Sequence, residues 1–417
     1  MKKPTYERAR ALVRRATGPL ASHLDAFAVS LIEQQYRASV TYIKVRHGLA
    51  LDRWLAKRHV VLSDLSEEQI ERYQKRCRRR RGSIRLATRQ IERKAVTQLL
   101  EFLRARSVCP AARIVTTAAE DLVTHFAQHL QDQRGLACAT IERYCWVARQ
   151  FLNYRFGRGD VDLRRLCAGD VVAFVKQESQ RLQPPALKCV TNSLRSLLRY
   201  AQFRGEVQAA LVAAVPAVSA WSTTPALPKA ISPEHARRAI HSCDLRTGVG
   251  LRDRAVLLLL ARLGLRSHEI ISLQLDKLSW ESGHIRLQGK GGREQLLPLP
   301  TDVGAAIAAY LHKGRPRSHD RHVFLRSQAP IHGLAIGSDG IGSIVRSALE
   351  RAGVKAPHCG SHQFRHALAV NMLQHGASLE EIGEVLRHQS PQTTSIYARV
   401  DISALRLLAL PWPGGAR

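Results

Sequence analysis

The chain has 417 residues, of which 45% are hydrophobic, so it is long enough and apolar enough to bury more than one globular core and is neither a tail nor a fibre. Its 64 Lys and Arg residues exceed the 34 Asp and Glu residues and give a formal net charge of +30 at pH 7, which is typical of nucleic-acid binding. The positive charge runs through every segment, which disfavours a protein that binds membranes through one basic amphipathic helix.

The cysteines and the N-terminus indicate a reducing compartment. The eight cysteines form no C-x-x-C pair and accompany no histidines at zinc spacing, so we expect free thiols, no metal site and no cofactor. The N-terminus lacks the apolar stretch of a signal peptide, and the most apolar run, residues 255–265, is short and interrupted by Arg262. We therefore expect a cytoplasmic protein with no membrane partner.

Two segments in which helical periodicity fades divide the chain. The first is residues 107–117, and the second is residues 216–228, where three prolines predict an extended connector. We expect an N-terminal helical module in residues 1–106, a second helical module in residues 117–215, a linker in residues 216–228 and one further domain in residues 229–417.

The two helical modules resemble each other with a period of roughly one hundred residues. The aligned segments are Arg53-Trp54-Leu55 with Gln150-Phe151-Leu152, Asp64-Leu65 and Ile70 with Arg165-Leu166 and Val171, and Leu99-Leu100-Glu101-Phe102 with Leu197-Leu198-Arg199-Tyr200. Each copy predicts about four amphipathic helices with basic residues on the outer faces. An internal duplication explains the pattern; the alternative is that two unrelated amphipathic bundles look alike.

The last domain begins with a helix-start signal, in which Ser232 is the N-cap and Pro233 the first helical residue. Helices dominate the rest of this domain, with one exception between residues 280 and 299. There, residues 284–287 and 295–297 flank a glycine-rich segment, residues 289–293, which predicts a small antiparallel hairpin. The fold class is therefore mainly α with a small β-sheet.

Cleaving a phosphodiester without a metal requires a nucleophile, cations on the non-bridging oxygens and a proton donor for the leaving oxygen. The last domain contains candidates for all three. In chain order they are Arg266, Lys290, His362, Arg365, His388 and Tyr397, with Glu269 as a supporting residue. Glu269 lies three residues after Arg266 and can face and fix its guanidinium. His362 and Arg365 are one helical turn apart.

The nucleophile can be chosen from the tyrosines of the last domain, which are only Tyr310 and Tyr397. Tyr310 lies in an ordinary amphipathic helix. A tyrosine needs nearby cations to act as a nucleophile at neutral pH, and only Tyr397 has them in its motif. We expect Tyr397 to attack, and a covalent phosphotyrosine would store the bond energy without ATP.

These motifs resemble the tyrosine recombinase (phage integrase) family, which includes the Xer, Cre and lambda integrase proteins. The resemblance covers about residues 227–400, through Leu263 to Ile270, Gly289 to Leu299, His362 to His366 and Leu386 to Tyr397. It implies an α+β catalytic domain and, with helical modules, a C-shaped clamp around DNA. It also implies roles for the candidate residues: Arg266 and Arg365 clamp the scissile phosphate, Lys290 protonates the leaving 5′ oxygen, His362 and His388 handle protons, and Tyr397 attacks.

The chain departs from the commonest family pattern at two places. Arg387 stands where the family most often has Gly, and Gln363-Phe364 replaces the frequent Asp-Leu. Neither is a catalytic position. The bulk and charge of Arg387 predict either a differently shaped loop or a contact with phosphate.

By the same resemblance, residues 117–204 look like the family's helical, SAM-like core-binding domain. We expect helices at residues 140–155 and 186–204 to face the groove. The candidate DNA-binding residues are Arg143, Arg149, Lys188, Arg195, Arg199 and, in the hairpin turn, Arg293. The expected partner is double-stranded DNA at recombination sites. We expect a homo-oligomer, a tetramer, to bind these sites, and accessory proteins are a further possible partner. The protein would then be associated with the nucleoid.

The N-terminal module is either a second DNA-binding unit or a protein–protein module. Its basic run from Lys75 to Arg81 favours DNA over a solvated loop. Residues 402–410 predict a short apolar helix that in this family often packs on a neighbouring protomer. The leading hypothesis for the whole chain is a site-specific recombinase of a mobile element; the alternatives are a type IB-like topoisomerase and a catalytically idle DNA-binding factor.

Overall fold

The computed structural model describes residues 5–65, 67–80, 86–111, 117–157, 159–218, 230–288, 294–334, 340–356, 360–388 and 390–400. It is mainly helical and contains one small three-stranded sheet, as the sequence predicts. No helix among these residues is long and apolar enough to cross a membrane. The apolar tail, residues 402–410, and most of the linker lie outside the described residues.

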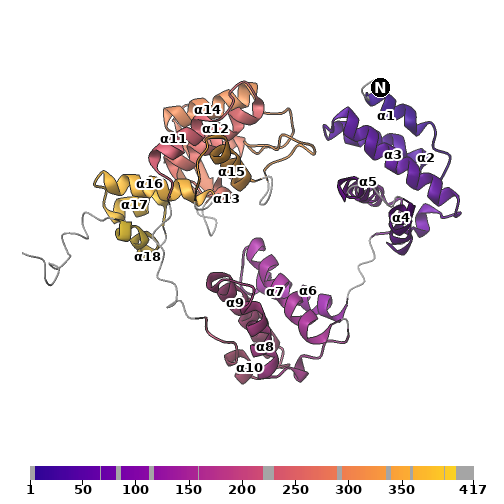
Figure 1. Ribbon diagram of the computed structural model, residues 1–417, viewed down its shortest axis with the longest axis horizontal. Helices are drawn as coiled ribbons and strands as arrows, with labels where there is room; N and C mark the ends of the chain where they lie inside the picture. Colours follow the sequence, from indigo (N-terminus) through magenta and orange to yellow (C-terminus); the bar gives the residue numbers. More distant parts are fainter. Residues whose placement is uncertain are drawn as a thin grey trace, which may run out of the picture. The chain divides into compact units, whose positions relative to one another are not determined.

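The second helical module forms a compact unit within residues 112–225. Its elements are α6 (Ala118–Asp132), α7 (Cys138–Phe156), η2 (Leu163–Arg165), α8 (Ala168–Ser179), α9 (Pro184–Phe203) and α10 (Ala209–Ala213). Helix α7 packs against α6, α8 and α9 (Figure 1). Gly157, with φ +61°, ends α7, and Pro184 begins α9 at a position where its missing N–H costs nothing. Both predicted groove-facing segments are therefore helices.

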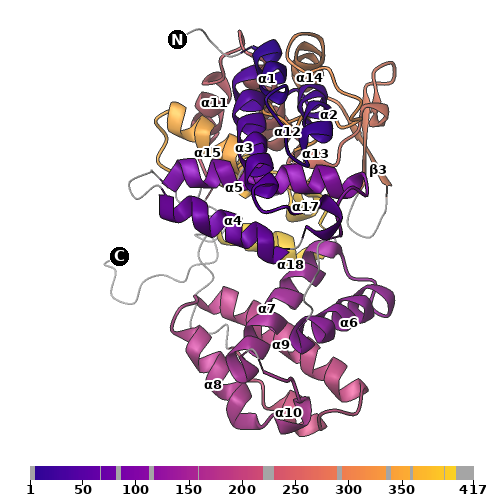
Figure 2. The same cartoon turned by 90° about the vertical axis from the view of Figure 1, so that its right-hand side faces the viewer.

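The N-terminal module has its own apolar core. Its elements are α1 (Tyr6–Val13), α2 (Ala21–Glu33), α3 (Ala38–Ala56), η1 (Leu62–Asp64), α4 (Glu67–Arg80) and α5 (Leu86–Ala105). Helix α3 packs against α1, α2 and α5, and Figure 2 shows this module from a second side. The buried Asp52 accepts hydrogen bonds from the backbone N–H groups of Gly18 and Leu20 at 2.9 and 2.8 Å and so fixes the loop between α1 and α2.

The elements from α2 to α5 recur in the same order from α6 to α9. Helices α3 and α7 both have 19 residues, and α5 and α9 both have 20. An aromatic pair recurs too: the ring centroids of Phe27 and Phe102 lie 5.4 Å apart, and those of Phe126 and Tyr200 also lie 5.4 Å apart. These correspondences favour an internal duplication over a chance likeness.

One part of the predicted repeat alignment is out of register. The sequence alignment pairs Phe151 with Trp54. The buried positions of α3 and α7 coincide, however, when Phe151 is matched with Leu51, three residues before Trp54. Three residues make almost one helical turn, so both alignments place apolar residues on the same face. The sequence pattern alone therefore does not separate them.

The last domain is built around α12 (Gly248–Leu263), which is buried on almost all sides and packs against α14 (Thr301–Lys313) and α16 (His362–Gln374) (Figure 1). The remaining helices are α11 (Pro233–His241), α13 (Ser267–Ile271), α15 (Ile341–Arg351), α17 (Leu379–Leu386), α18 (Pro391–Thr394), η3 (Leu275–Lys277) and η4 (Ser395–Val400). The Ser232 hydroxyl accepts a hydrogen bond from the His235 N–H at the start of α11, which confirms the predicted N-cap.

The predicted hairpin is present. Strands β2 (His284–Gln288) and β3 (Glu294–Pro298) pair antiparallel, with Ile285 opposite Leu297. A third strand, β1 (Leu278–Ser279), pairs with β2; the sequence does not predict it, because two residues are too few to show a strand periodicity. The glycine-rich turn, residues 289–293, lies outside the described residues, and so do Lys290 and Arg293.

Candidate active site

Arg266 is placed by a tight turn and by a buried carboxylate. Gly264 ends α12 in the left-handed conformation, φ +55°, and an added Cβ would lie 2.7 Å from Leu386 Cδ2, so the turn requires glycine. Arg266 follows as the N-cap of α13, and Glu269 Oε1 accepts a hydrogen bond from Arg266 Nη1 at 2.9 Å. This is the contact that the three-residue spacing predicts. The Arg266 side chain remains 38% exposed and can still reach a ligand.

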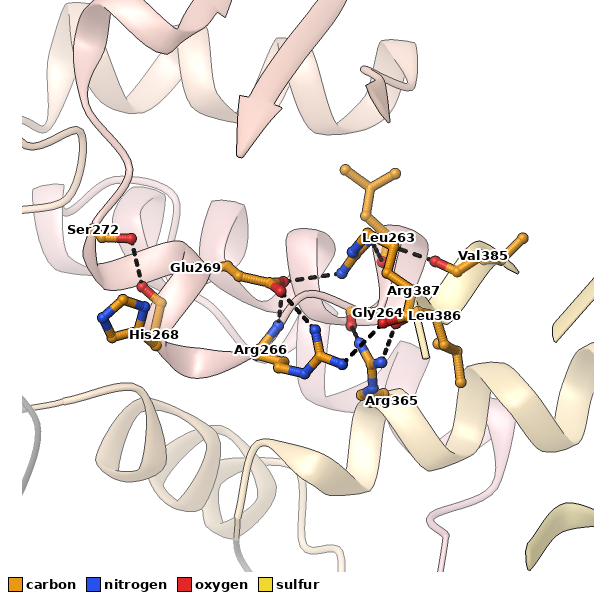
Figure 3. A network of polar contacts seen from close by, with 10 residues as sticks. All are labelled: Leu263, Gly264, Arg266, His268, Glu269, Ser272, Arg365, Val385, Leu386 and Arg387. Atoms are coloured by element: carbon orange, nitrogen blue, oxygen red, sulfur yellow. Dashed lines mark hydrogen bonds and ion pairs between the residues drawn. The ribbon is translucent and has the colours of Figure 1, made fainter. Parts of the chain in front are cut away.

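Arg365 lies on α16, three residues after His362, and is buried. Its guanidinium donates to the carbonyl oxygens of Gly264 and Leu386, so it links the turn after α12 to the end of α17 (Figure 3). Burial and the neighbouring Arg266 lower the pKa of Arg365 to about 10. A cation held this way would be stabilised by an anion, such as a phosphate, that enters beside it.

Arg387 occupies the left-handed C-cap of α17, φ +57°. Its side chain is only 5% exposed, and its Nη2 donates to Glu269 Oε2 at 2.9 Å (Figure 3). In this structure Arg387 therefore has a protein partner; its left-handed backbone is one that glycine adopts without strain, so neither the differently shaped loop nor the phosphate contact is confirmed. The sequence does not predict the pairing of Arg387 with Glu269, because this carboxylate lies more than a hundred residues earlier in the chain.

Three histidines lie near Tyr397. His388 stacks on the Tyr397 ring with centroids 6.5 Å apart and an interplanar angle of 6°, and its Nδ1 lies 2.7 Å from Thr394 Oγ1. His366 Nδ1 lies 2.9 Å from the Tyr397 hydroxyl oxygen. His362 lies one turn earlier on α16, with its ring centroid 6.3 Å from that of His366.

His366 is the residue that sequence reasoning missed. It ends the motif that begins at His362, and the family resemblance assigns it no role, although its position four residues after His362 places both rings on one face of α16. Of these histidines, His366 has the direct contact with the Tyr397 hydroxyl.

The histidines are neutral at neutral pH. Burial, and then the nearby Arg365 and Arg266, lower the pKa of His388 to about 4. Burial and Arg365 also lower the pKa of His362, and burial and His362 lower that of His366. A neutral imidazole has one nitrogen that accepts a proton, so each of these rings can act as a base.

Tyr397 itself is almost completely buried, at 1% exposure, against Ala369, Ile382 and Leu386. Burial raises the pKa of its hydroxyl, and Arg365 offsets this only in part. In the chain without DNA, burial therefore outweighs the effect of Arg365 on this pKa, and the activation of Tyr397 by neighbouring cations stays a prediction. Tyr310, the other tyrosine of the domain, is buried in the main core and accepts a hydrogen bond from Leu325 N–H, which fits a structural role.

Comparisons with known proteins give the family of this chain. A model of the Phage integrase family matches residues 229–403. The chain is 44% identical over 411 residues to y4rA of Sinorhizobium fredii, a protein named as an integrase/recombinase, and the match covers 98% of each chain. It is 30% identical over 289 residues to the tyrosine recombinase XerD of Listeria monocytogenes, covering 67% of this chain and 94% of that one.

The chain belongs to the phage integrase family of tyrosine recombinases. It is thus an enzyme, a DNA recombinase of the tyrosine type. Solved structures share the fold at low identity. XerH bound to palindromic difH substrate matches with a TM-score of 0.55 and 18% identity over 73% of this chain and 99% of that one. A lambda integrase dimer bound to a COC′ core site matches with a TM-score of 0.50 and 15% identity over 66% and 94%.

The candidate DNA-binding residues of this recombinase fall into two groups. Arg143, Lys188 and Arg199 have exposed side chains. Arg149 instead donates to Glu120 at 2.9 Å, and Arg195 donates to the carbonyl oxygens of Val215 and Pro216 at 3.0 and 2.9 Å. The first group is therefore better placed to meet phosphates than the second.

Proposed function

We propose that this recombinase is a site-specific enzyme that cleaves and rejoins DNA strands through a 3′-phosphotyrosine on Tyr397. The observation that carries the proposal is the convergence of one tyrosine, three neutral histidines and the buried Arg365 within one domain, with Arg266 next to them. Electrostatic stabilisation by preorganised cations is a large part of phosphoryl-transfer catalysis, and two arginines supply it here without a metal.

The bond changes are those of a transesterification. The Tyr397 oxygen forms a bond to the scissile phosphorus as the bond from phosphorus to the 5′ oxygen breaks. The hydroxyl proton passes to a neutral histidine, and the departing 5′ oxygen takes a proton from a donor. We assign the arginines to the non-bridging oxygens, Lys290 to the departing oxygen, His366 to the proton of Tyr397, and His362 and His388 to the other proton transfers and hydrogen bonds. Rejoining reverses these steps with a 5′ hydroxyl of a new strand.

A conformational step precedes cleavage in this proposal. Tyr397 at 1% exposure and Arg365 at 4% exposure are not open to a phosphate. The segment that follows His388, with α18 and η4, must therefore shift when DNA binds, so that Tyr397 and Arg365 reach the same phosphorus. Binding energy from the rest of the duplex would drive this shift.

The test is covalent capture on a nicked suicide duplex, from which the cleaved fragment diffuses away. We expect the wild type to form an adduct and Tyr397→Phe to bind DNA without forming one, while Tyr310→Phe, the matched control, still forms it. An adduct with Tyr397→Phe would show that the nucleophile is assigned wrongly. Strand exchange after capture indicates a recombinase, relaxation of supercoils indicates a type IB-like topoisomerase, and no capture by the wild type indicates an idle binding factor.

We further propose that residues 117–215 bind the core of each recombination site, with Arg143, Lys188 and Arg199 on phosphates, and that the active assembly on duplex DNA is a homotetramer. The two related helical modules support a duplication in which residues 1–106 are a second DNA-binding unit. Within the basic run from Lys75 to Arg81, Lys75 is paired with Glu71 at 3.0 Å and is 61% exposed. An additional module on a basic chain also supports a role in a mobile element.

A further inference from the structure

Arg387 holds a backbone conformation that its residue type disfavours. It is left-handed, φ +57° and ψ +50°, at the C-cap of α17, where a glycine would be unstrained. Its side chain is almost fully buried. Burying a guanidinium is costly unless it is paired, so the contacts of this side chain must offset both penalties.

These contacts join the two segments that carry the site. Arg387 Nη1 lies 3.3 Å from the carbonyl oxygen of Leu263 and 3.4 Å from that of Val385. Arg365 links the adjacent carbonyls of Gly264 and Leu386. The two arginines therefore span the same pair of segments side by side (Figure 3). One segment leads directly to Arg266, and the other leads directly to His388.

Arg387 also shares the carboxylate that holds Arg266. Glu269, 5% exposed in its side chain, accepts from Arg387 Nη2, from Arg266 Nη1 and from the Arg266 backbone N–H, each at 2.9 Å. In turn, Arg266 Nη2 donates to the carbonyl oxygen of Arg387 at 3.2 Å. The three residues form a closed network in which Glu269 faces two guanidinium groups.

The charge balance of this network sets how much positive charge is available to the scissile phosphate. Arg266, Arg365 and Arg387 against Glu269 leave a net charge of +2; without Arg387 the same group has +1. A phosphodiester attacked by a tyrosinate carries two negative charges in the transition state. With Arg387 present, Glu269 is compensated by a residue that does not face solvent, and the charge of the half-exposed Arg266 is left for the phosphate.

We propose that Arg387 is a positioning residue for strand cleavage: it neutralises Glu269 and ties the Arg266 segment to the His388 segment. The inference rests on the proposed phosphotyrosine function of the same site. It extends that function, because Arg387, 5% exposed and paired with Glu269, acts through Arg266.

The experiment measures single-turnover cleavage of a nicked suicide duplex at saturating protein. Arg387→Met removes the charge and keeps most of the bulk, and we expect it to slow cleavage by about 10- to 100-fold, as for loss of one charged hydrogen bond, with unchanged DNA affinity. Arg387→Lys should recover part of the rate. Arg387→Met with Glu269→Gln should cleave faster than Arg387→Met alone, because no carboxylate then neutralises the charge of Arg266.

A second substrate separates charge from structure. A methylphosphonate at the scissile position removes one negative charge from the transition state, so the defect of Arg387→Met should be smaller there than on the phosphodiester. The control is Arg246→Met, which breaks the exposed pair with Asp244, 90% and 48% exposed, and should cleave at the wild-type rate.

Wild-type cleavage by Arg387→Met would overturn the inference, as would an equal defect on both substrates or no recovery in the double variant. Circular dichroism and thermal melting check that each variant is folded. If Arg387→Met alone does not fold, Arg387→Gln, which is also neutral and can donate to the same carbonyl oxygens, replaces it in both measurements. Absence of an adduct with the wild-type protein, or an adduct with Tyr397→Phe, would instead refute the proposed function.

Discussion

Removal of the His366 imidazole should uncouple DNA binding from cleavage. His366 Nδ1 lies 2.9 Å from the Tyr397 hydroxyl, and its pKa is lowered, so in the neutral tautomer with its proton on Nε2 it can accept the tyrosine proton. A positioned general base contributes about 10²- to 10⁴-fold to a rate, and we expect His366→Ala to lose a factor in this range. DNA affinity should be unchanged, because the ring contacts the buried Tyr397.

The pH dependence gives a sharper readout. In the wild type the cleavage rate should rise as the pH passes through the pKa of His366, below about 6.5, and then level off. In His366→Ala the tyrosine must lose its proton to solvent. Its raised pKa then predicts a rate that still climbs between about pH 7 and pH 9.

The assay is single-turnover capture on the suicide duplex across a pH series. His375→Ala is the matched control, since His375 is exposed at the C-terminal end of the same helix and its Nδ1 lies 2.7 Å from the Asn371 carbonyl oxygen. His366→Asn retains a hydrogen-bond acceptor without a base and should stay slow. Wild-type rates for His366→Ala, or an unchanged pH profile, would refute proton transfer through His366.

Four other perturbations test the site, the fold and the N-terminal module. Cleavage should persist in EDTA, because the proposed mechanism assigns to arginines and Lys290 the charge stabilisation that a metal would otherwise supply; activity restored only by magnesium would contradict this. Gly264→Ala should lower the free energy of unfolding by about 1–2 kcal/mol, measured by urea unfolding, because φ is +55° and the new Cβ would meet Leu386. The pKa values of His362, His366 and His388 are lowered in the folded state, so the unfolded chain binds more protons below about pH 6.5. The melting temperature should therefore fall as the pH is lowered from about 6.5 toward about 4. An invariant melting temperature would contradict the lowered pKa values. Deleting residues 1–106 should reduce the slope of log affinity against log salt by about 0.9 for each phosphate that the shortened protein no longer neutralises, whereas an unchanged slope with failed synapsis would indicate a protein–protein module.

Local signals in the sequence are sufficient for the parts of the fold that depend on near neighbours. The Ser232 cap and the hairpin of β2 and β3 are predicted correctly because capping residues and strand alternation act over a few positions. The candidate catalytic residues are found in the sequence in the order that is typical of the family, and the family resemblance assigns their roles. The roles of those residues, and the position of Lys290 in particular, remain predictions.

Contacts between distant segments could not be predicted. The contact between His366 and Tyr397 depends on how the chain turns between α16 and η4, and the pairing of Arg387 with Glu269 depends on the packing of α17 near α12. The burial of Tyr397 also depends on contacts between distant segments. The sequence shows cations near Tyr397 but not the apolar cluster of Ile382, Leu386 and Ala369 that raises its pKa.

The electrostatics of the site imply that DNA completes it. Arg365 has a pKa lowered to about 10 because it is buried among other arginines, and Tyr397 has a raised pKa because it is buried away from water. An entering phosphate would relieve the repulsion among the guanidinium groups, and the shift that admits it would bring Tyr397 closer to their positive charge. The shift favours the tyrosinate, whereas the phosphate is itself an anion and opposes it, so loss of the tyrosine proton also needs an acceptor such as His366. The nucleophile is therefore expected to remain protonated until a phosphate is in place, which would restrict cleavage to bound DNA.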